Sequence, residues 1–549
     1  MRGYKAKTGL LFLLAMAGSV HAEDDKFDIQ RFSFSGNTLL SSAQIEATIA
    51  PFAGRDRVFG DVQKALEAIE AAYRAAGYGA VRVVFPEQEL LGGVVHLQIA
   101  ELTIRRIHVE GNTVFSPANL RAALTALQVG KAPNLQQLSD NIARSNENPA
   151  KKIHLSFATN EEGDALDATI KVQDRSPHYV GTSSNNEGTE ASGKWRSGMV
   201  YQYANLFDRD HVLSMAFALA PDSPKGVRHE QLSLAYRVPL YAQGASIDLL
   251  YGKSNSTTPG STPALGGTLN LTGKGELAGL RLRKNLGRDA ALTSELVASL
   301  DYQYIDSRCT SMDGVELSTA PPTPPVASCV PYTLQPLGLS YAVSSMRGQT
   351  WLEGSLGLFG NLASGPQYRN LSGRMDRYSY LTPGNRDTRD NFFLLRGAFK
   401  MRHGFANDMQ LQLALSGQYA RVPMLSAQLF GLAGANAVRG FDERAVVADS
   451  GLLGSLELAS PEWKLHAASQ MRLRLLAFCD AGLGKNRSPN DMVPETVRLA
   501  SCGLGVRGGI GDGGTLRADL ARIQQLDNAV SSSAETGDTR AHVSVQFGF

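Results

Sequence analysis

Residues 471–482 read Met-Arg-Leu-Arg-Leu-Leu-Ala-Phe-Cys-Asp-Ala-Gly. Large apolar side chains stand at Met471, Leu473 and Leu475, and arginines occupy the two positions between them. An apolar period of two residues is typical of a β-strand with one apolar and one polar face. The segment therefore predicts a strand whose charged face lies in water or in a polar interior.

The same alternation continues through residues 178–549, which are rich in Gly, Ser, Leu and Tyr. In a soluble sandwich the apolar faces point inward, whereas in an outer-membrane barrel they face lipid and the polar faces line the lumen. The alternating segments are about 10 to 17 residues long, which exceeds the usual soluble strand. The chain also ends in such a strand, residues 542–549, with a terminal aromatic residue. These features favour a transmembrane barrel.

Sixteen strands can be placed, and an even number is what single-chain bacterial barrels have. The links between them alternate between short and long, and the four longest are expected outside the cell: 256–270, 309–331, 363–390 and 423–450. The prediction is a 16-stranded antiparallel transmembrane β-barrel over 178–549. Its strands are 178–188, 193–206, 211–220, 228–241, 245–255, 271–286, 290–308, 332–346, 348–362, 391–405, 408–422, 451–463, 469–485, 497–511, 514–524 and 539–549.

Residues 1–22 have the features of a secretory signal peptide. Basic residues precede an apolar stretch that is too short to span a bilayer, and Val20-His21-Ala22 resembles a cleavage site. The mature protein is therefore expected to leave the cytoplasm. The 54 basic and 52 acidic residues nearly balance, which argues against nucleic-acid binding through a basic field. A mean hydropathy of −0.16 excludes a polytopic helical membrane protein.

Two Gly-Asn-Thr triplets, at 36–38 and 111–113, mark an internal repeat. Each follows a strand-like run and precedes a helical pattern, and Gly-Asn suits a tight turn with positive φ. The order β-α-α-β-β then occurs twice, over 27–101 and 102–176. Repetition of element order is a stronger signal than any single motif. A pair of unrelated small α+β domains remains the alternative.

Two such modules after a signal peptide resemble POTRA domains. Asn146-Glu147-Asn148-Pro149 resembles the Asn-x-x-Pro segment common in the second POTRA domain of two-partner secretion transporters. Between the eleventh and twelfth predicted strands, Val438, Arg439, Gly440 and Phe441 resemble the signature of the long sixth extracellular loop in the superfamily of BamA and these transporters. In that superfamily the loop folds into the barrel, and its Arg reaches an Asp in a Phe-x-Asp-x-Gly segment of strand 13.

The predicted strand 13 contains a matching segment, in which Phe478, Asp480 and Gly482 share the face of the arginines and so face the lumen. An Arg439–Asp480 pair in a partly dehydrated lumen would make charge-assisted, bidentate hydrogen bonds. Gly482 is expected to leave room for the loop backbone. A chance tetrapeptide at 438–441 is the alternative.

The four cysteines predict two possible disulfides, as suits an exported protein that uses few of them. Cys309 and Cys329 flank a Pro-rich stretch, and a bond between them would close that loop. Cys479 and Cys502 both fall on lipid-facing positions of two strands joined by one hairpin, where they could lie opposite each other.

Catalytic, cofactor and metal sites are not expected. Residues 503–508 satisfy G-x-G-x-x-G, but they do not lie between a strand and a helix, so a dinucleotide site is a poor interpretation. The ten histidines lack metal-binding spacing.

The whole chain resembles the TpsB class of two-partner secretion transporters, which includes the ShlB/FhaC/HecB-like haemolysin secretion/activation proteins. The resemblance implies that POTRA domains in the periplasm bind an unfolded TpsA-like exoprotein of haemolysin or adhesin type, which then crosses the lumen to the cell surface without ATP. It implies a monomer in outer-membrane lipid, with no nucleic-acid partner. Only residues 23–26 separate the predicted cleavage site from the first strand, so an N-terminal plug helix is not expected. The alternatives are a barrel-assembly factor of the BamA or TamA type and, in another class, a passive porin.

Overall fold

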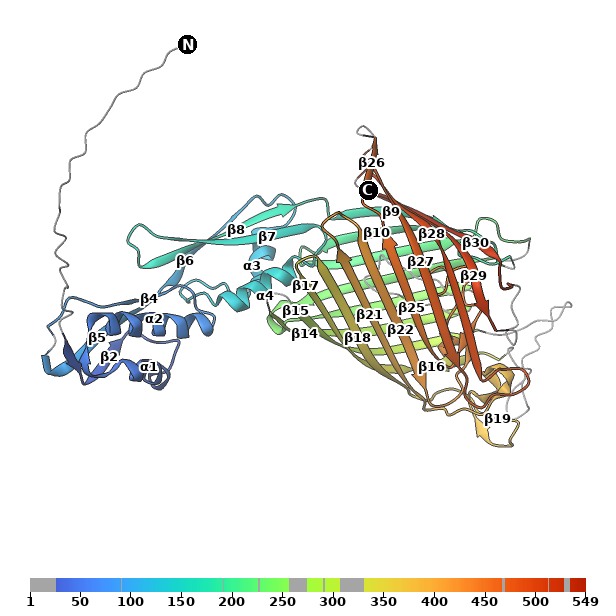
Figure 1. The fold of residues 1–549 in the computed structure, drawn as a ribbon, viewed down its shortest axis with the longest axis horizontal. Helices are drawn as coiled ribbons and strands as arrows, with labels where there is room; N and C mark the ends of the chain where they lie inside the picture. Colours follow the sequence, from blue (N-terminus) through green and yellow to red (C-terminus); the bar gives the residue numbers. More distant parts are fainter. Residues whose placement is uncertain are drawn as a thin grey trace, which may run out of the picture. The chain divides into compact units, whose positions relative to one another are not determined.

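The computed structural model describes residues 26–89, 91–190, 192–225, 228–255, 274–289, 292–306, 330–466, 470–511, 513–527 and 534–549 (Figure 1). The predicted signal peptide, residues 1–22, lies outside them. The chain divides into two compact units: residues 1–108, 126–138 and 157–168 form the first, and residues 109–125, 139–156 and 169–549 form the second.

The first repeat is a three-stranded sheet with two helices. The sheet order is β2-β5-β4, in which β2 (Arg31–Ser35) runs parallel to β5 (Val94–Glu101) and β4 (Val81–Val84) runs antiparallel to it. The helices α1 (Ser42–Ile49) and α2 (Phe59–Ala75) carry apolar residues three and four positions apart, which places them on one helix face. They bury Ile45, Ile49, Val62, Ile69 and Tyr73 in a core with the sheet. Two short strands, β1 (Phe27–Ile29) and β3 (Gly54–Arg57), pair beside it.

The second repeat has the same element order. Its strands β6 (Thr103–Glu110), β7 (Lys151–Thr159) and β8 (Ala165–Asp174) form a sheet of order β6-β8-β7, and its helices are α3 (Pro117–Ala123) and α4 (Leu135–Ser145). The predicted order β-α-α-β-β is therefore confirmed in both repeats. Helix α3 ends at Ala123, where Leu124 leaves helical conformation (φ −103°, ψ 64°), and Leu124 and Leu127 are both buried.

The Gly-Asn-Thr turns have one physical explanation in both repeats. Gly36 and Gly111 have φ of 88° and 81°, and a Cβ at either position would overlap a carbonyl oxygen of the repeat's last strand. The Thr that follows donates its backbone N–H to a carboxylate at the end of that strand, over 2.8 Å from Thr38 to Glu101 and 2.9 Å from Thr113 to Asp174. The predicted positive-φ turn is confirmed, and the acid that anchors it was not foreseen.

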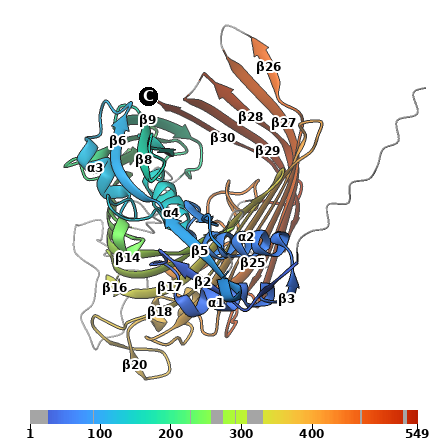
Figure 2. The same cartoon turned by 90° about the vertical axis from the view of Figure 1, so that its left-hand side faces the viewer.

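The remainder is a closed antiparallel barrel of sixteen strands (Figures 1 and 2). Two strands are interrupted, because β16 and β17 both pair with β15, and β25 and β26 both pair with β27. The segments are β9 (His178–Asn185), β10 (Arg196–Leu206), β11 (His211–Leu219), β12 (Glu230–Leu240), β13 (Ala245–Asn255), β14 (Lys274–Asp289), β15 (Leu292–Ile305), β16 (Tyr332–Leu334), β17 (Pro336–Arg347), β18 (Thr350–Asn361), β21 (Phe393–Gly404), β22 (Gln410–Ala420), β25 (Ser450–Ala459), β26 (Trp463–His466), β27 (Met471–Lys485), β28 (Thr496–Ile510), β29 (Gly514–Leu526) and β30 (Thr539–Gly548).

The predicted strand count is confirmed, with differences at two strands. The segment predicted over 451–463 ends at Ala459, because Pro461 has no N–H for the ladder and the side chain of Ser460 accepts the N–H of Leu475. The segment predicted over 332–346 is divided at Gln335, whose N–H is taken by the side chain of Asn361. Most of the predicted long links 256–270 and 309–331 lies outside the described residues, whereas 363–390 and 423–450 are described.

Candidate functional site: a loop held inside the barrel

The predicted lumenal residues of β27 do face the barrel interior. Phe478 and Asp480 are buried, whereas Leu475 and Leu483, on the opposite parity, are 44% and 47% exposed. The neighbouring strands follow the same pattern, since Glu457 lies between the exposed Leu456 and Leu458. Polar side chains of these strands therefore point into one lumen, as the alternation predicts.

The segment between β22 and β25, residues 421–449, is called the lumenal loop below. It contains a short helical turn, η7 (Ser426–Gln428), and a two-stranded ribbon of β23 (Phe430–Gly431) and β24 (Val447–Ala448). Its tip carries the Val-Arg-Gly-Phe signature, in which Val438 and Phe441 are fully buried and Arg439 is 2% exposed. A loop cannot bury its tip this way while projecting into solvent, so the tip lies within the barrel.

Arg439 and Asp480 form a bidentate pair. Arg439 Nε lies 2.7 Å from Asp480 Oδ2, and Arg439 Nη2 lies 2.7 Å from Asp480 Oδ1. The backbone N–H of Arg439 also donates to Oδ2 over 3.2 Å. The ring of Phe478 lies under the guanidinium, with 3.4 Å from its centroid to the guanidinium carbon. All three predicted groups therefore meet in one contact, which combines ionic, hydrogen-bonding and cation–π terms.

Two further carboxylates and two further arginines surround this pair. Arg439 Nη1 lies 2.7 Å from Glu457 Oε1 and 3.5 Å from Asp519 Oδ2. Asp519 also accepts from Arg507 and Arg517, over 2.6 and 2.8 Å. Three guanidiniums thus face three carboxylates, so the buried network has no net charge. That balance offsets much of the desolvation that a lone buried ion would suffer.

Apolar contacts hold the tip on either side of Arg439. Val438 and Phe441 pack in a cluster with Val497, Leu499 and Ile523 of the wall. A Cβ at Gly482 would lie 3.2 Å from the Val438 side chain. The side chains of Leu453 and Leu499 lie at the same distance, so two leucines of the wall and one loop side chain enclose the space at Gly482.

Gly440 and the residues after it tie the tip to the last strand. Gly440 has φ of 100°, which favours glycine, and its N–H donates to His542 Nε2 over 3.0 Å. Asp442 pairs with Arg540 on the same strand. The loop therefore contacts β25, β27, β28, β29 and β30, which together are called the clamped wall.

Five further residues of this site were not predicted from the sequence: Glu457, Asp519, Arg507, Arg517 and His542. Each is a polar residue on the lumenal parity of its strand, so the same alternation that identified Asp480 could have identified them. Sequence order alone does not reveal which lumenal charges meet, because that depends on the register between strands.

Cys479 and Cys502 are joined by a disulfide, on directly paired positions of β27 and β28. Cys309 and Cys329, the other predicted pair, lie outside the described residues. The parity that places Asp480 in the lumen places Cys479 on the opposite face.

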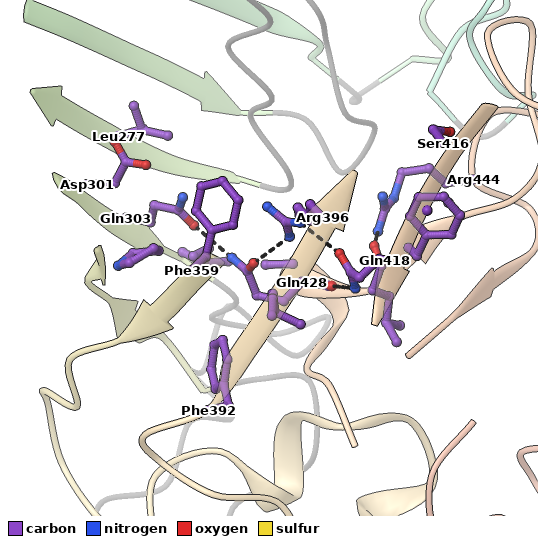
Figure 3. A pocket seen from close by; sticks show the side chains of 18 of the residues that line it. Leu277, Asp301, Gln303, Phe359, Phe392, Arg396, Ser416, Gln418, Gln428 and Arg444 are labelled. Atoms are coloured by element: carbon purple, nitrogen blue, oxygen red, sulfur yellow. Dashed lines mark hydrogen bonds between the residues drawn. The ribbon is translucent and has the colours of Figure 1, made fainter. Parts of the chain in front are cut away.

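The opposite side of the lumen holds a cavity of about 520 Å³ between the lumenal loop and the strands β14, β15, β18, β21 and β22, here called the open wall (Figure 3). In the ring of strands, β14 and β15 lie across the barrel from β28 and β29 (Figure 2). Paired charges line this wall, including Arg281 with Asp301 at 2.9 Å. The loop thus adheres to one wall and leaves space at the other.

A second fully buried ion pair joins the lumenal loop to the link between β18 and β21. Arg386 Nη1 lies 2.6 Å from Asp449 Oδ2, and neither side chain is more than 1% exposed. Asp449 also accepts from the backbone N–H groups of Met424 and Arg487. Three links are therefore tied together at one carboxylate.

The Asn-Glu-Asn-Pro turn meets the first short turn of the barrel. Asn148 Nδ2 donates to the carbonyl of Ala204 over 2.6 Å, and Lys151 Nζ lies 2.5 Å from Asp210 Oδ2, with both charged side chains buried. Burial lowers the pKa of Lys151, against the opposing effect of Asp210. The segment that resembles Asn-x-x-Pro thus forms part of a buried polar joint within the second unit.

Within the described residues, no helix is long and apolar enough to cross a membrane. Across the same part of the chain, His, Cys, Asp and Glu side chains form no group of three that could hold a metal ion.

Comparison with known proteins gives a consistent result. The family model of haemolysin secretion/activation proteins ShlB/FhaC/HecB matches residues 166–508, more than half of the chain, and that of the ShlB-type POTRA domain matches residues 27–101. Outer membrane transporter CdiB of Escherichia coli O6:K15:H31 is 22% identical over 236 residues, which cover 42% of this chain and 38% of that protein. The heme/hemopexin transporter protein HuxB of Haemophilus influenzae is 20% identical over 88% of this chain and 80% of its own length.

Solved structures show the same fold. CdiB from Escherichia coli superposes with a TM-score of 0.75 at 15% identity, covering 98% of this chain and 93% of that one. BamA from Haemophilus ducreyi lacking POTRA domains 1–3 gives 0.50 at 13% identity, covering 96% of this chain and 100% of the other. The protein lies in the outer membrane, with its POTRA domains in the periplasm. By its family model, its POTRA domain and its fold, the chain belongs to the ShlB/FhaC/HecB family of haemolysin secretion/activation proteins.

Proposed function

We propose that the protein carries one partner exoprotein, of TpsA-like haemolysin or adhesin type, through its barrel to the cell surface. The observation that supports this most is the asymmetry of the lumen. A charge-balanced network fixes the lumenal loop to the clamped wall, while a cavity of about 520 Å³ remains along the open wall. A polar, partly occupied lumen suits passage of an unfolded chain better than passage of small solutes alone.

The POTRA domains supply the recognition step in this proposal. In the first POTRA domain β4 pairs only with β5, and in the second β7 pairs only with β8, within the described residues. An extended segment of the exoprotein can add to such an edge by backbone hydrogen bonds. The buried joint of Asn148, Lys151 and Asp210 then holds the second domain at the barrel's first short turn.

Transport in this proposal uses no ATP and no enzymatic chemistry of the protein's own. The outer membrane has no nucleotide supply, and folding of the exoprotein outside the cell provides the direction. The barrel works as a monomer, with its exposed leucines in contact with lipid.

Deletion of the gene tests the proposal. We expect the loss of one large exoprotein from the culture medium while the other outer-membrane proteins stay at normal levels, measured by quantitative proteomics of medium and membranes. A general loss of outer-membrane proteins would instead indicate a barrel-assembly factor, which the fold shared with BamA makes the relevant competitor. An unchanged medium with altered uptake of small solutes would indicate a porin.

A further inference from the structure

The cavity at the open wall contains an arginine, Arg396, that has no anionic partner among the described residues. Arg396, on β21, donates from Nε to Gln418 Oε1 over 2.8 Å and from Nη2 to Gln428 Oε1 over 3.0 Å (Figure 3). Its guanidinium carbon lies 5.4 Å from the centroid of the Phe359 ring. Within the described residues no carboxylate lies within 4.0 Å of it, and its Nη1 makes no hydrogen bond.

The acidic groups that line the same cavity are engaged elsewhere or stand apart. Asp301 is paired with Arg281, and Glu276 is paired with Lys253. Glu443 lies in no ion pair among the described residues, and its Oε2 has no hydrogen-bond partner. A second cation, Arg444, lines the cavity and donates to the carbonyls of Ser426 and Leu429. In the part of the chain that the structure describes, both cations therefore donate to neutral acceptors only.

Neutral amides accept hydrogen bonds from a guanidinium but do not neutralise its charge. In a partly dehydrated cavity, that leaves an electrostatic cost which an anion would offset. The amides themselves are held in place. Gln418 Nε2 donates to the carbonyls of Gln428 and Asp449, over 2.8 and 3.0 Å, so its Oε1 is fixed toward Arg396. Gln428 Nε2 lies 3.4 Å from Gln303 Oε1. The hydrogen bonds of Gln418 and Gln428 therefore hold the guanidinium of Arg396 in a fixed position.

We propose that this cavity is a carboxylate-binding site, with Arg396 as its charged group and the amides of Gln303, Gln418 and Gln428 as its neutral ones. A carboxylate can accept from the guanidinium edge that the two glutamines leave unused, where Nη1 makes no hydrogen bond among the described residues, while the glutamines hold the guanidinium in place. The natural source of the carboxylate rests on the proposed function: it is an acidic side chain of the unfolded exoprotein in transit. A free dicarboxylate offers the same chemistry and is the other source to be tested.

The same strand offers a matched control. Arg402 also donates to a glutamine, Gln412, over 3.2 Å, and its guanidinium carbon lies 5.8 Å from the centroid of the Trp351 ring. It does not line the cavity, and its side chain is exposed to water. Arg402→Gln therefore removes the same charge from the same strand without touching the proposed site.

Binding can be measured on the purified full chain in detergent, with no exoprotein present. The probes are a short rhodamine-labelled Gly/Ser peptide that carries glutamates, the same peptide with glutamines, and free glutarate. Binding of free glutarate is measured by calorimetry. We expect the glutamate peptide to bind at least about tenfold more tightly than the glutamine peptide, because hydrogen bonds to charged groups are the stronger ones. Arg396→Gln should remove that preference, and Arg402→Gln should retain it. Arg396→Lys, which keeps the charge but not the fork, should give an intermediate affinity.

Each outcome has a defined meaning. Glutarate that binds as tightly as the glutamate peptide, and fails to bind Arg396→Gln, supports the site and assigns its source to free carboxylates. Equal binding of the two peptides overturns the proposal, as does an equal loss in Arg396→Gln and Arg402→Gln, which would reflect a general cationic field. If Arg396→Gln does not fold, as judged by heat-modifiable migration, Arg396→Lys carries the test. Because the assay contains no secretion step, its failure is distinct from failure of the gene-deletion experiment.

Discussion

Two arginines on opposite sides of the lumen, Arg439 and Arg396, have opposite kinds of partner. On the clamped wall, Arg439 contacts three carboxylates within a network that also contains Arg507 and Arg517. Each charged group in this network has a partner of opposite charge. On the open wall, Arg396 meets glutamine oxygens and an aromatic ring. Closed networks of charge fix a structure, whereas a cation with neutral partners keeps the capacity to bind something else. In the proposed function, the difference separates the side of the lumen that holds the loop from the side along which the exoprotein passes.

Replacement of Arg439 is expected to have the largest effect on the contrast between the two walls. Arg439→Ala leaves Asp480, Glu457 and Asp519 facing two arginines, and removing one partner from a buried pair costs about 3 to 5 kcal/mol. We expect a barrel that still inserts but unfolds at lower temperature, and secretion that is strongly reduced. Heat-modifiable migration of the purified variant and exoprotein in the medium measure the two effects. Undiminished secretion would refute the role given to the clamp.

Replacement of Arg386 tests whether a second buried arginine stabilises the lumenal loop as much as Arg439 does. Arg386→Ala removes the partner of Asp449, which keeps two backbone N–H donors, so we expect a smaller loss of about 2 to 4 kcal/mol. Secretion should fall by less than in Arg439→Ala, because the lumenal tip keeps its own network. The same two assays apply. A larger effect than that of Arg439→Ala would place the main support of the loop at Arg386–Asp449 and not at its tip.

Glu443, a residue of the lumenal loop that lines the cavity, gives the protein a predicted pH dependence of stability. Burial, and then the negative charge of Glu187, raise its pKa from 4.5 to about 7. An acid whose pKa is raised by folding is protonated more readily in the folded protein, so its contribution to stability falls as pH rises from its unfolded value to its folded one. The protein should therefore lose resistance to heat between pH of about 5 and pH of about 7.5.

Glu443→Gln serves as the control for that titration, since it carries the neutral form at every pH. Its unfolding temperature should change less over the same interval than that of the unaltered protein. An identical pH profile in both would show that another group controls the response.

The disulfide should matter least to secretion. Cys479 and Cys502 lie on the face away from the lumen, so their replacement by Ser leaves both walls unchanged. Stability should fall by about 2 to 3 kcal/mol, as for loss of a cross-link that closes a loop of this kind. Exoprotein in the medium should stay at the normal level. A drop in secretion without a drop in unfolding temperature would contradict the assignment of transport to the lumen.

Much of this molecule follows from local patterns in the sequence. Alternation in segments such as residues 471–482 predicts the strands, their number and the lumenal face, because side-chain parity is a local property. The Val-Arg-Gly-Phe and Phe-x-Asp-x-Gly segments predict the Arg439–Asp480 contact through family resemblance. Glu457 and Asp519 were missed, because the register between strands decides which lumenal charges meet.

The open wall could not be predicted in the same way. Arg396, Gln418 and Gln428 come from two strands and a folded loop, and no motif joins them. That Arg396 has only these neutral partners follows from the three-dimensional structure, in which the nearby carboxylates of Asp301 and Glu276 pair with other cations. The interruption at Pro461 reflects a missing N–H, which periodicity does not report.

The central claim is that the lumenal loop stays on the clamped wall while the exoprotein passes along the open one. A Cβ at Gly482 would lie 3.2 Å from the Val438 side chain, so Val438→Cys with Gly482→Cys places two thiols in reach across that contact. In a chain with Cys479→Ser and Cys502→Ser, the new bond can be formed by oxidation, verified by mass spectrometry and reversed by reductant. Secretion measured before and after oxidation should be equal. Secretion that stops on oxidation and returns on reduction would contradict the account.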